Sequence, residues 1–323
     1  MKAERHTRRE FFERAAAGGA SFAMIARFGD TTMAEHPAAE LGEPAKGTAI
    51  DAHVHVWTPD TAKYPLSAGY MRDEMVPASF TPEQLFAHMR PCGVGRVVLV
   101  QMSFYGFDNS YMLDSIRAFP SVFSGIAVID DSVARPQDEM RRLKPLGVRG
   151  FRIYPRNMPV DRWLESPGLK AMWECGAAER LAMCCLVNPD ALPAIDRMCE
   201  DHADTPVVID HCARIGMTGE IHEADLTQLC RLARHKNTYV KISAFYALGK
   251  KKSPYTDLAP MIRKLYEAFG AQRLMWATDC PYQVQGEHTY PDSIELVRSR
   301  LDFLGADDRA WLLHKTAERV FFS

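Results

Sequence analysis

The chain has 323 residues, of which 47% are hydrophobic and 25% charged, and its formal net charge is −2. This composition is ordinary for a globular protein, and the lack of a basic excess argues against nucleic-acid binding. No apolar run approaches the roughly 18 residues of a membrane span. The eight cysteines form no C-x-x-C pair, which argues against a zinc ribbon and favours buried free thiols.

Residues 1–45 differ in character from the rest of the chain. Within them Thr7, Arg8, Arg9 and Phe11 precede a weakly apolar stretch rich in Ala and Gly, and a polar segment follows. This pattern resembles a twin-arginine export signal with a linker. We therefore predict a signal and linker over 1–45 and a periplasmic protein. The alternative is a helical N-terminal extension on a cytoplasmic protein.

From residue 48 onward, short β-branched runs alternate with helical stretches. Thr81, with Pro82 next and Gln84 as its capping-box partner, marks the start of the first helix, and Asn109 is the expected cap of the second. The predicted strands cover 48–57, 96–101, 123–130, 148–154, 181–187, 206–211, 238–244 and 273–279. The predicted helices cover 81–93, 109–120, 135–147, 167–180, 188–202, 223–235, 255–270 and 291–305, with one more over 307–321.

Strands that alternate with helices favour parallel pairing, and eight such units favour a closed (β/α)8 barrel. We predict an α/β fold of this kind, a TIM barrel, as a single domain over 46–323 with an N-terminal extension and an extra C-terminal helix. The alternative is an open doubly wound sheet. That fold usually carries a Gly-rich fingerprint after its first strand, and none follows here.

The first predicted strand carries two histidines in an otherwise buried pattern, "AIDAHVHVW". Side chains two apart on a strand point the same way, so His53 and His55 would face one spot, with Asp51 on the same side. Such a pair suits metal ligation or a polar catalytic floor. The motif alone is short enough to arise by chance.

The barrel prediction brings further polar residues to this pair, because barrel chemistry lies at the carboxyl ends of the strands. His211 follows the sixth strand and Asp279 follows the eighth. Three imidazoles and one carboxylate would therefore converge. Other polar side chains at these ends are Gln101, Ser103, Arg152, Asp210, Lys241 and Ser243.

At these residues the chain resembles the amidohydrolase superfamily, through "DAHVH", "DHCAR" and "WATDCPY". The stretches "VQMSFYGFDNSYMLDSI", "VRGFRIY" and "VKISAFYALGKKKSPYTDLAP" resemble the branch that holds 2-pyrone-4,6-dicarboxylate hydrolase, sugar lactonases and galactarolactone isomerase. The resemblance runs in family order from about residue 48 to 320. It implies a TIM barrel and a hydrolase that opens the ring of a small anionic lactone.

The resemblance also implies roles for particular residues. Asp279 would activate water, while His53, His55 and His211 would polarise the carbonyl. The same four could hold one divalent metal, zinc above all, or work without a metal. The fourth strand offers Arg152 in place of the Lys or Glu of many metal-binding members, and the fifth offers only Cys184 and Cys185, which argues against a dinuclear site.

Arginines would hold substrate carboxylates, because guanidinium binds them with two hydrogen bonds. Arg152 and Arg214 match family positions, and Arg156 lies near a third. Ala247 stands where the family has a further arginine after the seventh strand, with Lys250, Lys251 and Lys252 just beyond. Tyr70 and Ser103, on loops at the same rim, are further candidates for substrate binding.

Three other functions remain open on the same barrel. A lactone isomerase would move the ring without water, and a metal-dependent nonoxidative decarboxylase would release CO2. A binding protein without activity would have no use for an acid–base constellation. No nucleic-acid or membrane partner is expected, and a homo-oligomer is left open.

Overall fold

The computed structural model describes residues 48–154, 159, 162 and 165–323. The predicted signal and linker over 1–45 and the candidate Arg156 lie outside these residues. The strands are β1 (Ala49–Val54), β2 (Val94–Val100), β3 (Phe123–Ala127), β4 (Val148–Ile153), β5 (Ala182–Cys185), β6 (Val207–Ile209), β7 (Thr238–Ile242) and β8 (Leu274–Trp276). The helices are α2 (Pro82–Met89), α3 (Ser110–Ala118), α4 (Pro136–Leu143), α5 (Pro167–Glu179), α6 (Leu192–Asp201), α7 (Glu223–Arg231), α8 (Ala259–Phe269), α9 (Tyr290–Glu295), α10 (Ala306–Ala310) and α11 (Thr316–Phe321).

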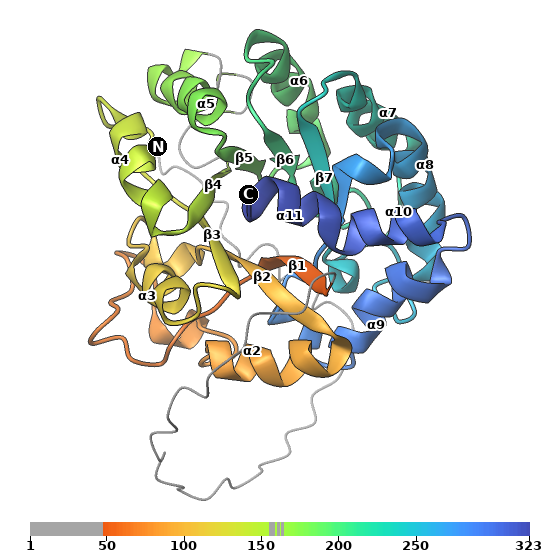
Figure 1. Ribbon diagram of the computed structural model, residues 1–323, viewed down its shortest axis with the longest axis horizontal. Coiled ribbons are helices and arrows are strands. Elements are labelled where there is room, and N and C mark those ends of the chain that lie inside the picture. Colours follow the sequence, from red (N-terminus) through yellow and green to blue (C-terminus); the bar gives the residue numbers. More distant parts are fainter. Residues whose placement is uncertain (1–47, 155–158, 160–161, 163–164) are drawn as a thin grey trace, which may run out of the picture. The chain divides into compact units, whose positions relative to one another are not determined.

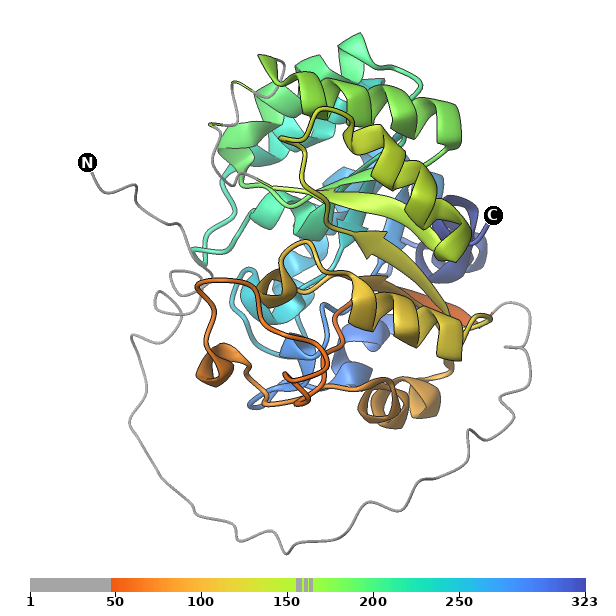
Figure 2. The ribbon, with the colours of Figure 1, turned by 90° about the vertical axis from the view of Figure 1, so that its left-hand side faces the viewer.

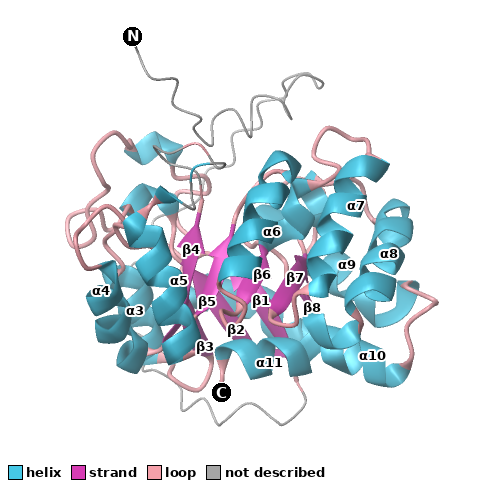
Figure 3. Ribbon diagram, turned by 90° about the horizontal axis from the view of Figure 1, so that it is seen from above, coloured by secondary structure: helices cyan, strands magenta, loops and turns pink. Residues whose placement is uncertain are grey.

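The strands form one parallel sheet in chain order, from β1 to β8. The sheet returns on itself where Val54 bridges Cys280. There the His55 N–H donates to the Cys280 carbonyl at 2.8 Å, and the Asp279 N–H donates to the His53 carbonyl at 2.9 Å. The helices surround the strands (Figures 1 and 3), the colours of Figure 1 pass around the ring in chain order, and Figure 2 shows the same molecule from the side. The predicted (β/α)8 barrel is confirmed.

The barrel interior opposite the predicted site is apolar and is covered by the C-terminal helix. In Figure 1 α11 lies across the middle of the ring, and Phe321 of this helix is fully buried. Burial of this surface stabilises the barrel at about 25 cal/mol per Å² of apolar area. The cluster comprises Ile50, Ala52, Val98, Val100, Ile126, Ala182, Cys184, Val208, Met275, Ala277, Ala317 and Phe321.

One predicted helix cap is confirmed and the other is not. Thr81 Oγ1 accepts a hydrogen bond from the Gln84 N–H at 3.5 Å. The Thr81 N–H donates to Gln84 Oε1 at 2.7 Å, which completes the capping box of α2. Asn109 precedes α3, but its side chain makes no capping bond. Instead it pairs with both backbone groups of Val128, at 2.9 and 3.1 Å. A tertiary contact has outcompeted the local cap.

Several strands end earlier than their apolar runs predicted. The run over 273–279 is a strand only over Leu274–Trp276, and the run over 206–211 only over Val207–Ile209. The predicted helix over 291–305 begins as α9 and continues as a wider π-type turn over Leu296–Arg300. The polar side chains at the carboxyl ends of these strands therefore lie in irregular backbone just after the last strand residue.

Asp51 does not share a face with the two histidines, contrary to the prediction. The pairing register of β1 shifts between Asp51 and Val54, so the strict alternation of side chains is broken there. The buried Asp51 carboxylate accepts hydrogen bonds from Thr278 Oγ1 at 2.5 Å, from the Thr278 N–H at 2.9 Å and from Tyr290 Oη at 2.7 Å. It therefore ties β1 to the end of β8 and to α9, where strand pairing between β1 and β8 is sparse.

We expect Tyr290→Phe to lower the free energy of unfolding by about 1.5–3 kcal/mol, the range for a hydrogen bond to a charged group. Burial raises the pKa of Asp51 to about 6, so urea unfolding at pH 8 compares states in which this carboxylate is ionised. Tyr266→Phe is the matched control, because Tyr266 also bonds a carboxylate, Asp308, but near the surface. Equal unfolding midpoints for the two variants would contradict a closing role for Asp51.

Candidate active site

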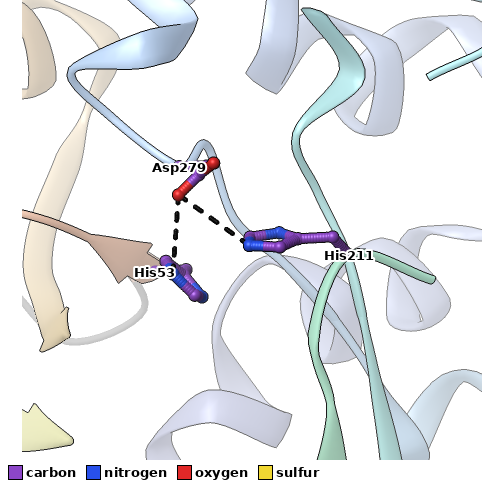
Figure 4. A group of neighbouring side chains, drawn as sticks. All are labelled: His53, His211 and Asp279. Carbon is purple, nitrogen blue, oxygen red and sulfur yellow. Dashed lines mark ion pairs between the residues drawn. The ribbon is translucent and has the colours of Figure 1, made fainter. Parts of the chain in front are cut away.

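Four polar side chains meet at the carboxyl ends of β1, β6 and β8. Oδ1 of Asp279 lies 3.2 Å from Nε2 of His55 and 3.5 Å from Nε2 of His53. Nε2 of His211 lies 3.8 Å from the same oxygen. Figure 4 shows Asp279 facing both His53 and His211 from a separate element. The structure thus brings together all four residues predicted as the catalytic and metal-binding set, and each is at most 5% exposed.

The backbone that carries this set adopts an unusual conformation. His211, Cys212, Ala213 and Arg214 follow one another with φ between 50° and 62°, and Asp279 has φ 68°. Left-handed backbone costs a non-glycine residue about 1–2 kcal/mol. Such cost persists where the surrounding structure enforces it, typically at functional sites. The turn aims His211 back across the barrel mouth toward Asp279.

The imidazoles of His53 and His211 are neutral at pH 7, and the Asp279 carboxylate is ionised. Burial lowers the pKa of His211 to about 4. Burial and the nearby Lys241 lower the pKa of His53 well below its usual value. Burial alone would raise the pKa of Asp279, but the neighbouring imidazoles, His211 first, outweigh it and hold the pKa below its ordinary range. The site therefore presents one ionised carboxylate beside the uncharged rings of His53 and His211.

The orientation of two rings follows from their outer partners. Nδ1 of His55 lies 2.8 Å from the Val100 carbonyl, which only accepts, so the ring hydrogen is on Nδ1. Nε2 of His55 then turns a lone pair toward the Asp279 carboxylate. Nδ1 of His211 lies 2.8 Å from Ser243 Oγ. Nε2 of His55 and Oδ1 of Asp279 are thus two acceptors that face each other at 3.2 Å, and such a pair requires a proton or a metal ion between them.

The set fits a divalent metal ion. Ligand atoms of His53, His211 and Asp279 all lie within 4.8 Å of one another. His53 Nε2 and Asp279 Oδ1 are buried and have no hydrogen-bond partner among the described residues. Two imidazoles and a carboxylate are a donor set common at catalytic zinc sites.

A second charged layer lies directly beneath the site, and its importance was not predicted. Lys241, fully buried on β7, has Nζ 3.0 Å from Asp210 Oδ1 and 3.3 Å from His53 Nδ1. A lysine inside the β-branched run "TYVKIS" was the signal in the sequence, because a lysine is almost never fully buried unless it is paired. The predicted substrate clamp Arg152, on β4, also lies here, with Nη2 4.0 Å from Asp210 Oδ2.

Tyr246, which was also not predicted, contacts the Asp279 carboxylate. Its hydroxyl donates to Asp279 Oδ2 at 2.7 Å, so Oδ1 is the oxygen left facing the histidines. Tyr246 belongs to the turn Phe245–Ala247 after β7, next to the position where the family arginine is missing. The hydroxyl thus fixes the rotation of the carboxylate.

We expect Tyr246→Phe to reduce kcat about 10-fold, because the loss of one hydrogen bond of about 1.5 kcal/mol frees the carboxylate to rotate. The measurement is steady-state kinetics on the substrate identified below, with Tyr282→Phe as the control. Tyr282 lies beside Tyr246, with ring centroids 6.3 Å apart, and its hydroxyl contacts Met102 Sδ at 3.9 Å. Unchanged kcat in Tyr246→Phe would show that the carboxylate needs no such restraint.

The remaining predicted residues lie around the rim. Arg214 donates to Asn188 Oδ1 at 3.0 Å, so it reaches across the loop after β5. Ser103 begins the turn after β2, and its buried Oγ has no hydrogen-bond partner among the described residues. Tyr70 lies half-buried in the loop after β1, where its N–H bonds the Ser67 carbonyl.

A family model described as Amidohydrolase matches residues 50–322, nearly the whole barrel. The chain belongs to the amidohydrolase family. The L-fucono-1,5-lactonase of Burkholderia ambifaria is 29% identical over 271 residues, which are 81% of this chain and 91% of that protein. The 2-pyrone-4,6-dicarboxylate hydrolase of Comamonas testosteroni is 26% identical over 256 residues, which are 76% of this chain and 81% of that protein.

Solved structures of other amidohydrolases share this fold. The probable 2-pyrone-4,6-dicarboxylic acid hydrolase of Acinetobacter baumannii, with citric acid bound, has a TM-score of 0.72 at 24% identity, covering 85% of this chain and all of that chain. An amidohydrolase from Burkholderia multivorans with bound zinc has a TM-score of 0.71 at 20% identity, covering 85% of this chain and 99% of that chain. No described helix of this amidohydrolase is long and apolar enough to cross a membrane.

Proposed function

We propose that this amidohydrolase is a hydrolase that opens the ring of a lactone, with Asp279 as the base that activates water. The observation that carries this proposal is the Asp279 carboxylate held 3.2 to 3.8 Å from three imidazoles. The relatives named above support it, since two of them are a lactonase and a pyrone dicarboxylate hydrolase.

Each residue has a defined part in the reaction. Asp279 takes a proton from water, whose oxygen attacks the lactone carbonyl carbon. The imidazoles of His53 and His211 can stabilise the charge that develops on the carbonyl oxygen. Nε2 of His55 carries no hydrogen and lies against the Asp279 carboxylate, so His55 helps to place that carboxylate. The ester C–O bond then breaks, and Asp279 returns its proton to the departing ring oxygen. The products are one open-chain hydroxy acid or its enol form.

A metal ion held by His53, His211 and Asp279 would supply Lewis-acid polarisation of the carbonyl when bound. Elemental analysis of the purified protein, together with activity before and after chelation, decides whether the site works with a bound metal ion or without one. Activity lost with the metal and restored by zinc would assign the ion. Full activity of metal-free protein would show that Asp279 and the imidazoles open the lactone ring without a metal ion.

Arg152 is the residue that we propose for a substrate carboxylate. It is buried at the end of β4, and its partner Asp210 lies 4.0 Å away and also pairs with Lys241. Guanidinium in this position can hold a carboxylate with two hydrogen bonds. The substrate is then a lactone that carries at least one carboxylate, or whose ring carbonyl reaches Arg152.

The test is a ring-opening assay on 2-pyrone-4,6-dicarboxylate, followed by the loss of pyrone absorbance, and on sugar-acid lactones, followed by acid release. Product analysis separates the alternatives, because an isomerase would return a moved ring and a decarboxylase would release CO2. Turnover of no lactone in the panel would overturn the proposal.

We also propose export by the twin-arginine route, on the strength of Arg8, Arg9 and Phe11. A reporter that folds before transport, fused after residue 45, is expected in the periplasm. Substitution of both arginines by lysine should retain it in the cytoplasm. Transport that persists in the double variant would contradict this route.

A further inference from the structure

The loops after β7 and β8 form an aromatic wall beside Asp279. Tyr246 bonds the carboxylate directly, as described above. Its ring centroid lies 6.1 Å from that of His288. His288 in turn stacks on Tyr255, with ring centroids 6.0 Å apart and an interplanar angle of 26°. His288 is therefore one residue removed from the catalytic carboxylate, although it stands nine positions further along the chain.

A chain of hydrogen bonds orients this histidine. Nε2 of Gln283 donates to the Thr289 carbonyl at 3.1 Å and to Tyr255 Oη at 3.0 Å. Since the carbonyl only accepts, the amide of Gln283 has its nitrogen on this side. Tyr255 Oη lies 2.8 Å from Nδ1 of His288. Gln283 and Tyr255 are almost fully buried, so this series of hydrogen bonds is rigidly held.

These hydrogen bonds set which nitrogen of His288 carries the hydrogen. Tyr255 Oη already accepts from Gln283, and its single hydrogen points to Nδ1 of His288. Nδ1 is then the acceptor, so the hydrogen of the neutral ring is on Nε2. Burial lowers the pKa of His288, which keeps the ring uncharged at pH 7. His288 thus offers an uncharged N–H donor from a half-buried position at the rim.

The charges nearby indicate what this donor would meet. The loop after β8, residues 277–289, contains neither lysine nor arginine, and the loop after β7, residues 243–258, contains no arginine. Its three lysines, Lys250, Lys251 and Lys252, come after the turn that carries Tyr246. A carboxylate is recognised by guanidinium or ammonium groups. Neutral N–H and phenol groups instead match hydroxyl groups, and a site built on them rejects a substrate that lacks the hydroxyl.

We propose that His288 is a specificity-determining residue that donates a hydrogen bond from Nε2 to a ring hydroxyl of the lactone, with Tyr255 as its positioning residue. The substrate class is then a polyhydroxylated lactone derived from a sugar, with any carboxylate turned toward Arg152. This inference rests on the proposed lactone hydrolysis and narrows it to one class of substrate.

The experiment compares kcat and KM for a panel of aldono-1,5-lactones with those for δ-valerolactone, which has the same six-membered ring without hydroxyl groups. The wild-type protein is expected to prefer at least one aldonolactone. In His288→Phe the ratio of kcat/KM values, aldonolactone over δ-valerolactone, is expected to fall about 10-fold, mostly through KM. This is the effect of one lost hydrogen bond near 1.4 kcal/mol.

Tyr255→Phe should lower the same ratio by a smaller factor, because His288 remains but its tautomer is no longer set. His222→Phe, at an exposed histidine before α7, is the matched control and should leave the ratio unchanged. A wild-type protein that opens lactones but gives the same ratio in His288→Phe would overturn this inference alone. A wild-type protein that opens no lactone would overturn the proposed function with it.

Discussion

Asp279→Asn is expected to reduce kcat for lactone opening at least about 100-fold, the lower end of the loss when a general base is removed. The amide keeps the shape of the side chain and can still accept a hydrogen bond from Tyr246, whose hydroxyl donates to Oδ2 of Asp279 at 2.7 Å in the wild-type protein. It cannot take a proton from water. The measurement is steady-state kinetics with the best lactone of the panel, together with circular dichroism to establish that the barrel is intact.

The matched control is Asp302→Asn, at a carboxylate whose side chain is 89% exposed and pairs with Arg263 at 3.0 Å. It should retain wild-type kcat, since a surface ion pair of this kind contributes little. If Asp279→Asn turned over lactone at a near-normal rate while well folded, Asp279 would have no part in proton transfer.

Lys241→Met is expected to lower the free energy of unfolding by about 3–5 kcal/mol, the cost of breaking a buried pair and leaving one charge uncompensated. Asp210, fully buried, would lose the ammonium 3.0 Å from its Oδ1 and would keep Arg152, 4.0 Å from Oδ2, and Nδ1 of His53, 3.5 Å from Oδ1. Methionine has a similar length and would fill the space above Phe321, whose ring centroid lies 5.4 Å from Lys241 Nζ. Urea unfolding at pH 7 measures the change.

A double variant separates charge from packing. Lys241→Met with Asp210→Asn removes both charges, so it should recover part of the stability lost in Lys241→Met. Lys252→Met, at an exposed lysine of the loop after β7, should unfold at the wild-type midpoint. A double variant no more stable than the single one would mean that packing, and not the unpaired carboxylate, causes the loss.

The sequence predicted this site to the extent that the fold could be predicted. His53 and His55 stand two apart in one run, and His211 and Asp279 each follow an apolar run, so an eight-strand barrel was enough to bring them together. Tyr246 and Tyr255 could not be found in this way. They lie in irregular turns after β7, and no periodicity predicts which way a side chain points from such a turn.

The sequence by itself determined the order of the elements, the barrel and the ends of the strands at which the chemistry gathers. Hydrophobic periodicity is a local property, and strands that alternate with helices pair in parallel. Only the tertiary structure decided the partners. The register shift in β1 turned Asp51 away from the histidines toward Tyr290. The closing of the barrel set Lys241 against Asp210 and His53. Contacts between residues some 30 to 240 positions apart depend on the register in which the strands pair, and no pattern along the chain encodes that register.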